Sequence, residues 1–293
     1  MIQQSRFRER MSKYTRQEKI LLPIFHLFLL IMVVWTIFPV LFGLMNSLKE
    51  VTEYNRDAVS FPTHLHWENY KLAFELEYRN TNVLGMLFNT VVFVATYSVA
   101  NIVSSLMSAY ALSRFQFRGR TFLYSLAVTI QIIPVFGSVG SSYLLVYNLG
   151  LLDNLALMWI TSLGGFDYTF LIIYSYFVNV DRSYAEAAKM DGASNLTIFL
   201  KIMTPMVMPS ILVMWLSTFI GLWNNYTTPL IFLPSYPTLS TGIYNLQRLS
   251  AYMKGGMTAF FAAIMISLVP ILLVFTITQR KIFSINVEGG VKG

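Results

Sequence analysis

The sequence predicts an all-α integral membrane protein with six transmembrane helices and with both termini in the cytoplasm. Three observations support this class: a low content of charged residues, long apolar stretches, and an uneven distribution of lysine and arginine. Only 12% of the 293 residues are charged, which is about half the share found in soluble domains. A helix needs about 20 consecutive apolar residues to cross the hydrocarbon core. The longest apolar stretches exceed this length, so the expected solvent is a lipid bilayer.

Six apolar segments are the predicted transmembrane helices. They cover residues 20–48, 83–112, 121–147, 154–178, 206–233 and 257–279. The first is too long for the apolar region of a signal peptide, and it lacks a cleavage site of small residues. We expect it to be kinked or to end near Pro39, because proline lacks the backbone N–H. The whole of 20–279 is expected to form one transmembrane domain.

The distribution of positive charge predicts the orientation. The basic tail 1–19, the C-terminal tail 280–293 and the loops on the same side hold 15 of the 21 lysines and arginines. Because these residues accumulate in cytoplasmic loops, both tails are predicted to be cytoplasmic and the polar loop 49–82 to be external. The net charge of +7 is concentrated at the ends of apolar segments. This pattern is typical of membrane proteins and argues against nucleic acid as a partner.

Several kinds of chemistry are not expected. The chain has no cysteine, which excludes disulfides and thiolate metal sites. His64 and His66 lie in the predicted external loop and are expected to be solvated, so no metal site is predicted. The glycine pairs 164–165, 255–256 and 289–290 lack the lysine of a nucleotide-binding loop. We therefore expect no cofactor bound by this chain and no enzymatic activity of its own.

The loop between the fourth and fifth apolar segments is polar and lies on the predicted cytoplasmic side. The pattern Ser183-Tyr-Ala-Glu186 is that of a capping box and predicts a helix that begins at Ser183. Gly192 suits the left-handed position that ends such a helix. Ser194 or Asn195 can then cap a second helix.

The second helix of this loop is predicted to pack against another element. Its apolar stripe consists of Ile198, Phe199, Ile202 and Met203. Pro205 disfavours helical geometry at Thr204, so the chain is expected to turn there and to enter the membrane at Met206. The local pattern thus predicts a helical hairpin at the membrane surface, and it fits an ordinary interfacial hairpin as well as a functional one.

The same loop, 180–205, also contains a longer pattern. Glu186-Ala187-Ala188 is followed by Gly192, Ile202 and Pro205, which resembles the E-A-A-x3-G-x9-I-x-L-P loop of importer-type ABC permeases. Thr204 replaces the leucine of that pattern. In this family the loop receives force from a separate ATPase subunit. The resemblance implies a coupling role for seven residues: Glu186, Ala187, Ala188, Asp191, Gly192, Ile202 and Pro205.

Three further stretches resemble carbohydrate permeases of the maltose type. They are Gly221-Leu-Trp223-Asn224-Asn225-Tyr226-Thr-Thr-Pro229-Leu230, Ala109-Tyr-Ala-Leu-Ser-Arg114-Phe, and the ending 289–293. Within this group the chain is similar to permeases for complex oligosaccharides, including alginate oligosaccharides. The resemblance implies the type I importer fold in the bacterial cytoplasmic (inner) membrane. It also implies a heterodimer with a second permease, two copies of a cytosolic ATPase that bind ATP and Mg, and an extracytoplasmic solute-binding protein.

Asp167 is the single residue among fourteen acids that falls within an apolar segment. It follows Gly164-Gly165 and is expected near the middle of the fourth helix. Because an intramembrane acid is costly, it usually faces a cavity or a partner. One hypothesis is that Phe166, Asp167 and Tyr168 face the translocation path and that Asp167 hydrogen-bonds sugar hydroxyls. The alternative is a contact with a neighbouring subunit or a notch for helix packing.

Residues 223–226 are the second group of candidates for the substrate path. Asn224 and Asn225 are two amides in an apolar segment, where polar groups need partners. Trp223 and Tyr226 provide aromatic faces on which sugars stack. The two amides equally suit a contact with the partner permease.

The sequence thus predicts a permease subunit of an ABC importer for a carbohydrate. The nearest alternative is a permease of the same mechanism for another solute, although an uncharged and aromatic path favours sugar. An ion-coupled secondary transporter is a different class. It normally needs several intramembrane ionisable residues and often contains inverted repeats. A purely structural membrane protein is the remaining alternative.

Overall fold

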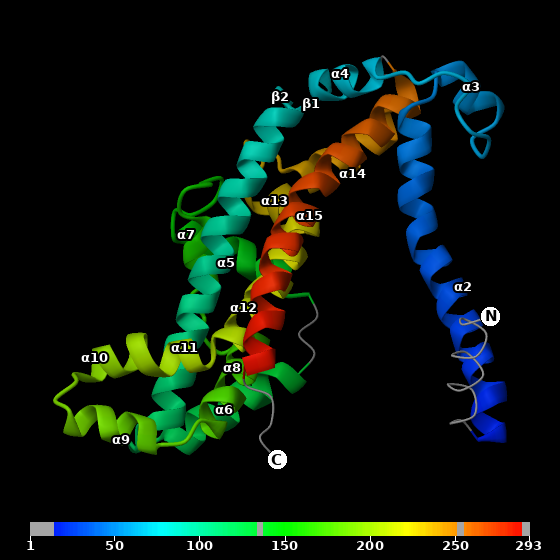
Figure 1. Ribbon diagram of the computed structural model, residues 1–293. Coiled ribbons are helices and arrows are strands. Elements are labelled where there is room, and N and C mark those ends of the chain that lie inside the picture. Colours follow the sequence, from blue (N-terminus) through cyan, green and yellow to red (C-terminus); the bar gives the residue numbers. More distant parts are fainter. Residues whose placement is uncertain (1–14, 134–136, 251–254, 289–293) are drawn as a thin grey trace.

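Helices form almost the whole structure (Figure 1). The computed structural model describes residues 15–133, 137–250 and 255–288. Among these residues, three helices are long and apolar enough to cross a membrane, and a pair bent by 76° is a fourth candidate. The three are α2 (Arg16–Ser47), α5 (Val83–Arg114) and α15 (Gly256–Glu288), and the bent pair is Asn195–Met206 with Met208–Asn224. The structure thus supports the predicted all-α membrane class.

The helices at the two ends of the chain are longer than predicted. Helix α2 begins inside the predicted basic tail, where Thr15 and Glu18 form a capping box. It continues through Pro39 to Ser47 and therefore does not end near the proline. One missing N–H is tolerated because the hydrogen bonds on either side persist in an apolar medium. Helix α15 continues to Glu288, so most of the predicted tail 280–293 is helical; residues 280–288 contain no glycine or proline.

Three of the six predicted transmembrane segments are interrupted. The third segment forms α6 (Arg120–Ile132) and α7 (Val139–Asn148), the fourth forms η1 (Met158–Ser162) and α8 (Tyr168–Asn179), and the fifth forms α12 (Met208–Asn224) and α13 (Thr227–Phe232). Left-handed backbone occurs at Gly137 (φ +76°) and Gly165 (φ +67°), and extended backbone occurs at Asn225. These conformations are incompatible with a continuous α-helix.

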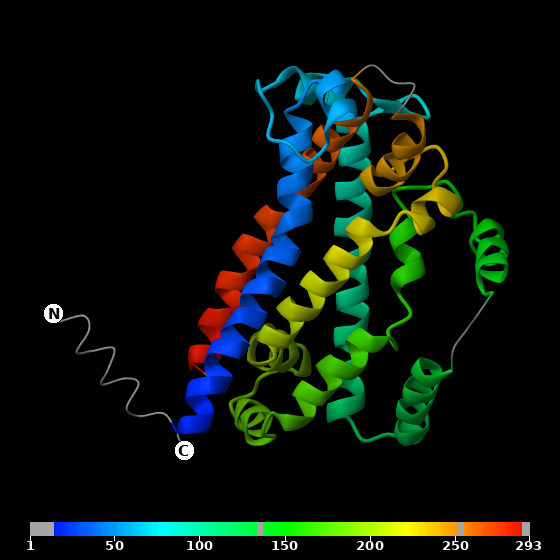
Figure 2. The same ribbon diagram turned by 90° about the vertical axis from the view of Figure 1, so that its right-hand side faces the viewer.

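The short elements gather at the two ends of the molecule. At one end lie five of them: α3 (Val51–Arg56), α4 (Glu68–Glu75), β1 (Glu77–Tyr78), β2 (Thr81–Asn82) and α14 (Leu239–Leu249) (Figure 1). Strands β1 and β2 form an antiparallel hairpin. At the opposite end lie α9 (Ser183–Met190), α10 (Asn195–Thr197), η2 (Ile198–Met203) and α11 (Thr204–Met206). The start of α2 and the end of α15 lie at this same end (Figure 2) but apart from α9 and α10 (Figure 1).

Helix α5 is the centre of the packing. It contacts α8, α12, η1 and α14 along its length. Buried residues form two clusters, one around Phe93 and Trp223 and one around Phe170 and Met203. Helix α2 lies apart from this core: it packs on α15, where Phe42 meets Phe261, and then diverges from it (Figure 1). Trp35, nearer the start of α2 than Phe42, is 78% exposed, so this helix must be covered by lipid or by another subunit.

Valine at Gly242 should loosen the contact between α14 and α5. A Cβ atom at this position would overlap the sulfur of Met86, which is fully buried on α5. Overpacking of this kind costs about 1–3 kcal/mol, so we expect Gly242→Val to lower the Tm of the detergent-solubilised protein. The matched control is Gly221→Ala, since no heavy atom lies within 4 Å of a Cβ there. An unchanged Tm for Gly242→Val would contradict the packing described.

Candidate functional site

The first arm of the predicted cytoplasmic hairpin is helix α9. It begins at Ser183 as predicted, but the capping box between Ser183 and Glu186 is absent, and Arg182 occupies the N-cap position without a side-chain cap. In place of the capping box, Asp181 binds the start of the helix: its Oδ1 accepts a hydrogen bond from the backbone N–H of Ser183 at 2.9 Å. This backbone hydrogen bond is the main cause that lowers the pKa of the exposed Asp181 carboxyl.

The turn of the hairpin confirms the prediction made for Gly192. Its backbone is left-handed, with φ +82°. The N–H of Gly192 donates to the carbonyl of Lys189 at 3.1 Å, and the N–H of Ala193 donates to the carbonyl of Ala188 at 2.9 Å. These two bonds are the Schellman arrangement, which satisfies carbonyls at the end of a helix.

The second arm consists of α10, η2 and α11. Ser194, and not Asn195, caps it, because its Oγ accepts a hydrogen bond from the Thr197 N–H at 3.2 Å. Residues 198–203 form a π-helical turn. The predicted apolar stripe is confirmed: Ile198 and Met203 are buried in the cluster that α5 and α8 share, and Phe199 and Ile202 pack against it.

The chain leaves the hairpin later than predicted. Thr204 keeps helical geometry (φ −62°, ψ −46°), so the turn expected there is wrong. The direction changes at Val207 (φ −101°, ψ 9°), where the two helical parts meet at 76°. Pro205 and Pro209 each lie in the first turn of a helix. A proline in that position loses no intrahelical hydrogen bond. Thr204 therefore keeps helical backbone, although the residue before a proline usually adopts extended backbone.

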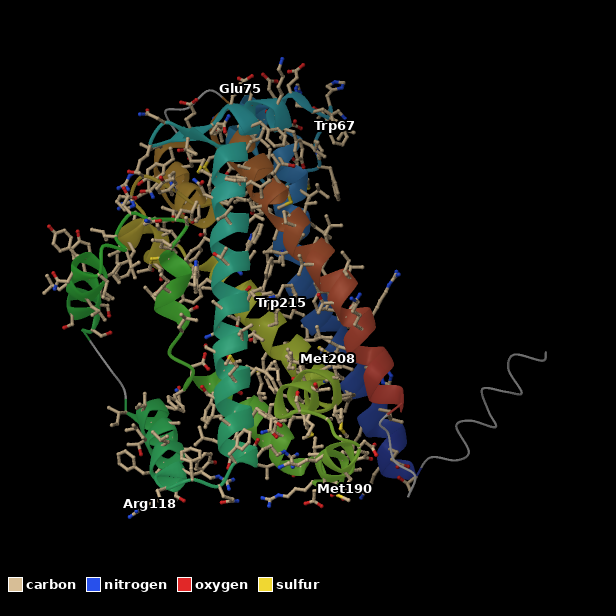
Figure 3. The ribbon with its side chains drawn as sticks, turned by 90° about the vertical axis from the view of Figure 1, so that its left-hand side faces the viewer. Trp67, Glu75, Arg118, Met190, Met208 and Trp215 are labelled. Carbon is tan, nitrogen blue, oxygen red and sulfur yellow. The ribbon has the colours of Figure 1, made fainter. Side chains whose placement is uncertain are left out.

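The hairpin has an inner side and an exposed side. Of the candidate coupling residues, Ala188 and Ile202 lie inward, whereas five are exposed: Glu186, Ala187, Asp191, Gly192 and Pro205. Met190 is 88% and Leu196 is 65% exposed on the two sides of the turn. Figure 3 places Met190 at the end of the molecule opposite Glu75 and Trp67. Exposed apolar side chains around a well-defined turn are typical of a docking surface.

Arg114 connects α5 to the start of this hairpin. Its Nη2 donates to the carbonyls of Phe177 (2.5 Å) and Val180 (2.7 Å), at the end of α8. Arginine in this position satisfies carbonyls that the helix leaves without partners. Sequence reasoning noted the stretch around Arg114 only as a resemblance and did not assign this role. With Glu186 and other hairpin residues, Arg114 also lines a cavity of about 240 Å³.

Asp167 lies at a helix start and not in the middle of a helix, which corrects the prediction. It is the N-cap of α8, and its Oδ1 accepts hydrogen bonds from the N–H of Phe170 at 3.0 Å and from Ser105 Oγ at 2.9 Å. Its Oδ2 accepts a hydrogen bond from Asn101 Nδ2 at 2.7 Å. The carboxylate therefore joins α8 to α5. Asn101 and Ser105 were missed, although their spacing of four residues in an apolar helix was a usable signal.

A cavity of about 450 Å³ lies beside this break, and Phe166 and Asp167 line it. Gln131 also lines it and donates its Nε2 hydrogen bond to the carbonyl of Phe166 at 2.9 Å. Gly165 packs closely on α5, since a Cβ there would lie 2.7 Å from Ser108 Oγ. Tyr168 is 62% exposed and is not among the lining residues.

The second group of candidates lies at the break between α12 and α13. Asn224 is the last residue of α12, and Asn225 follows it with extended backbone. The prediction that both amides lie within one continuous helical segment is therefore wrong. The Oδ1 of Asn225 accepts a hydrogen bond from the N–H of Thr228 at 3.0 Å and so caps α13. The Nδ2 of Asn224 donates to the carbonyl of Ile220 at 2.9 Å.

The aromatic residues of this group have two different environments. Trp223 is buried and stacks on Phe219, with 5.6 Å between the ring centroids. Tyr226 is partly exposed and stacks on Tyr244 of α14 at 4.3 Å. Trp223, Asn224 and Tyr226 line one cavity of about 340 Å³, which does not include the residues around Asp167. The structure thus separates the predicted path residues into two sites.

Long apolar helices, polar groups at breaks in apolar segments and an exposed hairpin at one end define a membrane transport subunit. Residues 100–283 match the family described as binding-protein-dependent transport system inner membrane component. The match covers more than half of the chain, and the chain therefore belongs to this family.

Curated relatives match along almost the whole chain. The diacetylchitobiose uptake system permease NgcG of Streptomyces coelicolor is 30% identical over 88% of this chain and 84% of its own length. The maltose/maltodextrin permease MalG of Salmonella typhimurium is 28% identical over 95% of this chain and 98% of its own length. A crystal structure of a bacterial ABC transporter for the acidic polysaccharide alginate contains a chain with a TM-score of 0.78 and 22% identity; the match covers 91% of this chain and 98% of that one. The structural similarity to this alginate transporter chain shows that the two chains share a fold.

Valine at Gly192 should distort the turn of the hairpin. A β-branched side chain in the left-handed region costs roughly 1–2 kcal/mol, while open space around the turn excludes a steric clash. We expect Gly192→Val to insert into the membrane normally and to lose transport. Gly119→Val is a matched control, because Gly119 is also left-handed (φ +93°) with open space but precedes α6. Equal transport by wild type and Gly192→Val would contradict a role for the turn.

Alanine at Asp167 should release α8 from α5. The change leaves Asn101 and Ser105 without their acceptor, and each unsatisfied buried group costs about 1–3 kcal/mol. We expect a lower Tm for Asp167→Ala and a smaller loss for Asp167→Asn, which retains one acceptor oxygen. Ser175→Ala serves as the control, since Ser175 is exposed on the same helix and bonds only the carbonyl of Ile172. A Tm of Asp167→Ala equal to that of the wild type would rule out a stabilising link between α8 and α5 through Asp167.

Proposed function

We propose that the chain is the membrane-spanning permease subunit of an ATP-driven, binding-protein-dependent importer for an oligosaccharide. The observation that carries the proposal is the exposed hairpin 183–206, with its left-handed turn at Gly192 and its apolar tip. A surface of this kind has no function in an isolated helix bundle, but it suits a soluble partner that delivers force. Family membership indicates that this partner is an ATPase.

The hairpin is built to transmit movement to the membrane-spanning helices. Its inner side is held by Ile198 and Met203 in the core that α5 and α8 share. Arg114 ties the end of α8 to α5 immediately before the hairpin begins. A force on the tip therefore reaches α5, α8 and α12 together. If ATP binding favours one of two arrangements of these helices, the subunit alternates between inward-facing and outward-facing states.

In this proposal the chain crosses the bacterial inner membrane six times. The three interrupted segments cross as broken helices, which membrane proteins tolerate where the open backbone faces protein or a water-filled cavity. The end that contains α9 and α10 is cytoplasmic, together with both termini. The end that contains α3, α4 and α14 is external and faces the solute-binding protein.

The remaining partners follow from the same proposal. Two copies of a cytosolic ATPase, with ATP and Mg, supply the energy, and a second permease subunit completes the path. The exposed side of α2 is available for that subunit or for lipid. The relatives' names, which include diacetylchitobiose and maltodextrin, support a carbohydrate as the solute.

An ion-coupled secondary transporter is less well supported. Its mechanism needs an ionisable group that exchanges its partner during transport. Asp167 is the one acid within the apolar segments, and it is held by Asn101, Ser105 and the start of α8. This arrangement suits a structural cap better than a site of ion exchange.

Lysine at Glu186 should weaken binding of the ATPase. Glu186 is exposed on the proposed docking side of α9, so reversal of its charge should reduce the amount of ATPase that copurifies with the complex and abolish ATP-dependent uptake. Glu75→Lys is the control, because Glu75 is also exposed but lies at the opposite end (Figure 3). The measurement is the ratio of ATPase to permease after purification in lipid nanodiscs. An unchanged ratio for Glu186→Lys, or uptake by wild type without ATP, would count against the proposed function.

A further inference from the structure

The cavity between the end of α12, Tyr226, α14 and α15 has no part in the coupling described above. Its volume is about 340 Å³, which falls in the range of small-molecule sites. Four of its lining residues belong to α14, which lies toward the end of the molecule opposite the hairpin (Figure 1). It therefore needs an explanation of its own.

One wall of the cavity is a pair of stacked tyrosines. The rings of Tyr226 and Tyr244 are almost parallel, with an interplanar angle of 13° and 4.3 Å between centroids. Both residues line the cavity, and they are 39% and 38% exposed. Each ring covers one face of the other, so the pair offers an outer ring face that is flat, apolar and supported from behind. The apolar C–H face of a pyranose ring is complementary to such a surface.

Polar groups lie at the edge of this surface. The Nδ2 of Asn224 donates one hydrogen bond to the carbonyl of Ile220, which leaves a second N–H. Within the described part of the chain, the Oδ1 of Asn224 accepts no hydrogen bond. Ser240 Oγ donates to the carbonyl of Asn225 at 2.9 Å and lies 3.0 Å from Thr238 Oγ1, so with Thr238 as donor one lone pair of Ser240 Oγ is left to accept. These groups match the donor and acceptor capacity of sugar hydroxyls.

The rest of the lining is uncharged. The described side chains around the cavity are aromatic, aliphatic, amide or hydroxyl, with Ile243, Leu268 and Ile271 as the aliphatic wall. A carboxylate in this site would lose water without gaining an opposite charge, which is costly. The site therefore favours a neutral sugar over a uronate.

We propose that this cavity binds one neutral pyranose unit of the transported oligosaccharide. The unit stacks on the outer face of the Tyr226–Tyr244 pair, and its hydroxyls bond Asn224 and Ser240. This inference rests on the proposed function and adds the site and the charge class of the substrate. It also assigns a role to the break between α12 and α13, because the break brings Asn224 and Tyr226 to the same cavity.

The test uses the complete transporter in proteoliposomes, with its ATPase and an excess of its solute-binding protein. The probes are tritiated maltotriose and diacetylchitobiose as neutral sugars, and alginate and galacturonate trimers as uronates. Wild type is compared with Tyr244→Ala, Tyr244→Phe and Asn224→Ala. Tyr236→Ala is the matched control, because Tyr236 lies between α13 and α14 and is 40% exposed but does not line the cavity.

We expect wild type to import at least one neutral probe and neither uronate. For Tyr244→Ala and Asn224→Ala, uptake should fall roughly tenfold, which corresponds to about 1.4 kcal/mol. ATPase stimulation by the loaded binding protein should persist in both, because the docking hairpin is intact. Tyr244→Phe keeps the ring and should keep uptake, as should Tyr236→Ala.

Four results would overturn the inference, and they are distinguishable. Unchanged uptake by Tyr244→Ala and Asn224→Ala would exclude the sugar site but leave the proposed function intact. Loss of the second permease from the purified Tyr244→Ala complex would show that the cavity is a contact with that subunit and not a sugar site. Import of uronates alone would refute the neutral class. No import of any probe by wild type, with ATPase activity indifferent to the binding protein, would refute the proposed function and the site together.

Discussion

The carboxylate of Asp167 holds a broken helix to the centre of the molecule. A chain that leaves helical geometry inside a membrane exposes N–H and C=O groups that the hydrocarbon cannot satisfy. Asp167 satisfies the first turn of α8 and at the same time binds Asn101 and Ser105 on α5. The interruption next to Gly165 is therefore stable, and the direction of α8 is set by α5. The position of the hairpin follows from that direction.

The second end of α8 is fixed in the same way. Arg114 bonds the last carbonyls of α8 from α5, so one central helix controls both ends of its neighbour. The hairpin starts only a few residues later, and its inner side returns to the same core through Ile198 and Met203. Helices α5, α8 and the hairpin thus form one mechanical unit. A unit of this kind is suited to carry a movement from one end of the membrane to the interior.

Local chemistry made much of the hairpin predictable. Gly192 has the required left-handed backbone, Ser194 caps the second arm, and the stripe that contains Ile198 and Met203 is buried. Each of these features depends on residues within a few positions along the chain. The capping box predicted at Ser183 does not form. Asp181, two residues earlier, accepts the backbone N–H of Ser183, which the side chain of Glu186 would accept in a capping box. Local pattern alone does not decide between two such caps.

The sequence by itself determined the membrane class, the apolar segments and the hairpin, because hydropathy, charge and turn chemistry act over short distances. It did not determine which residues meet at the breaks in these segments. The contacts of Asp167 with Asn101, and of Tyr226 with Tyr244, join residues from separate helices. Only the packing of α5, α8, α12 and α14 brings these residues together, since the energy that selects each contact depends on the position of both helices.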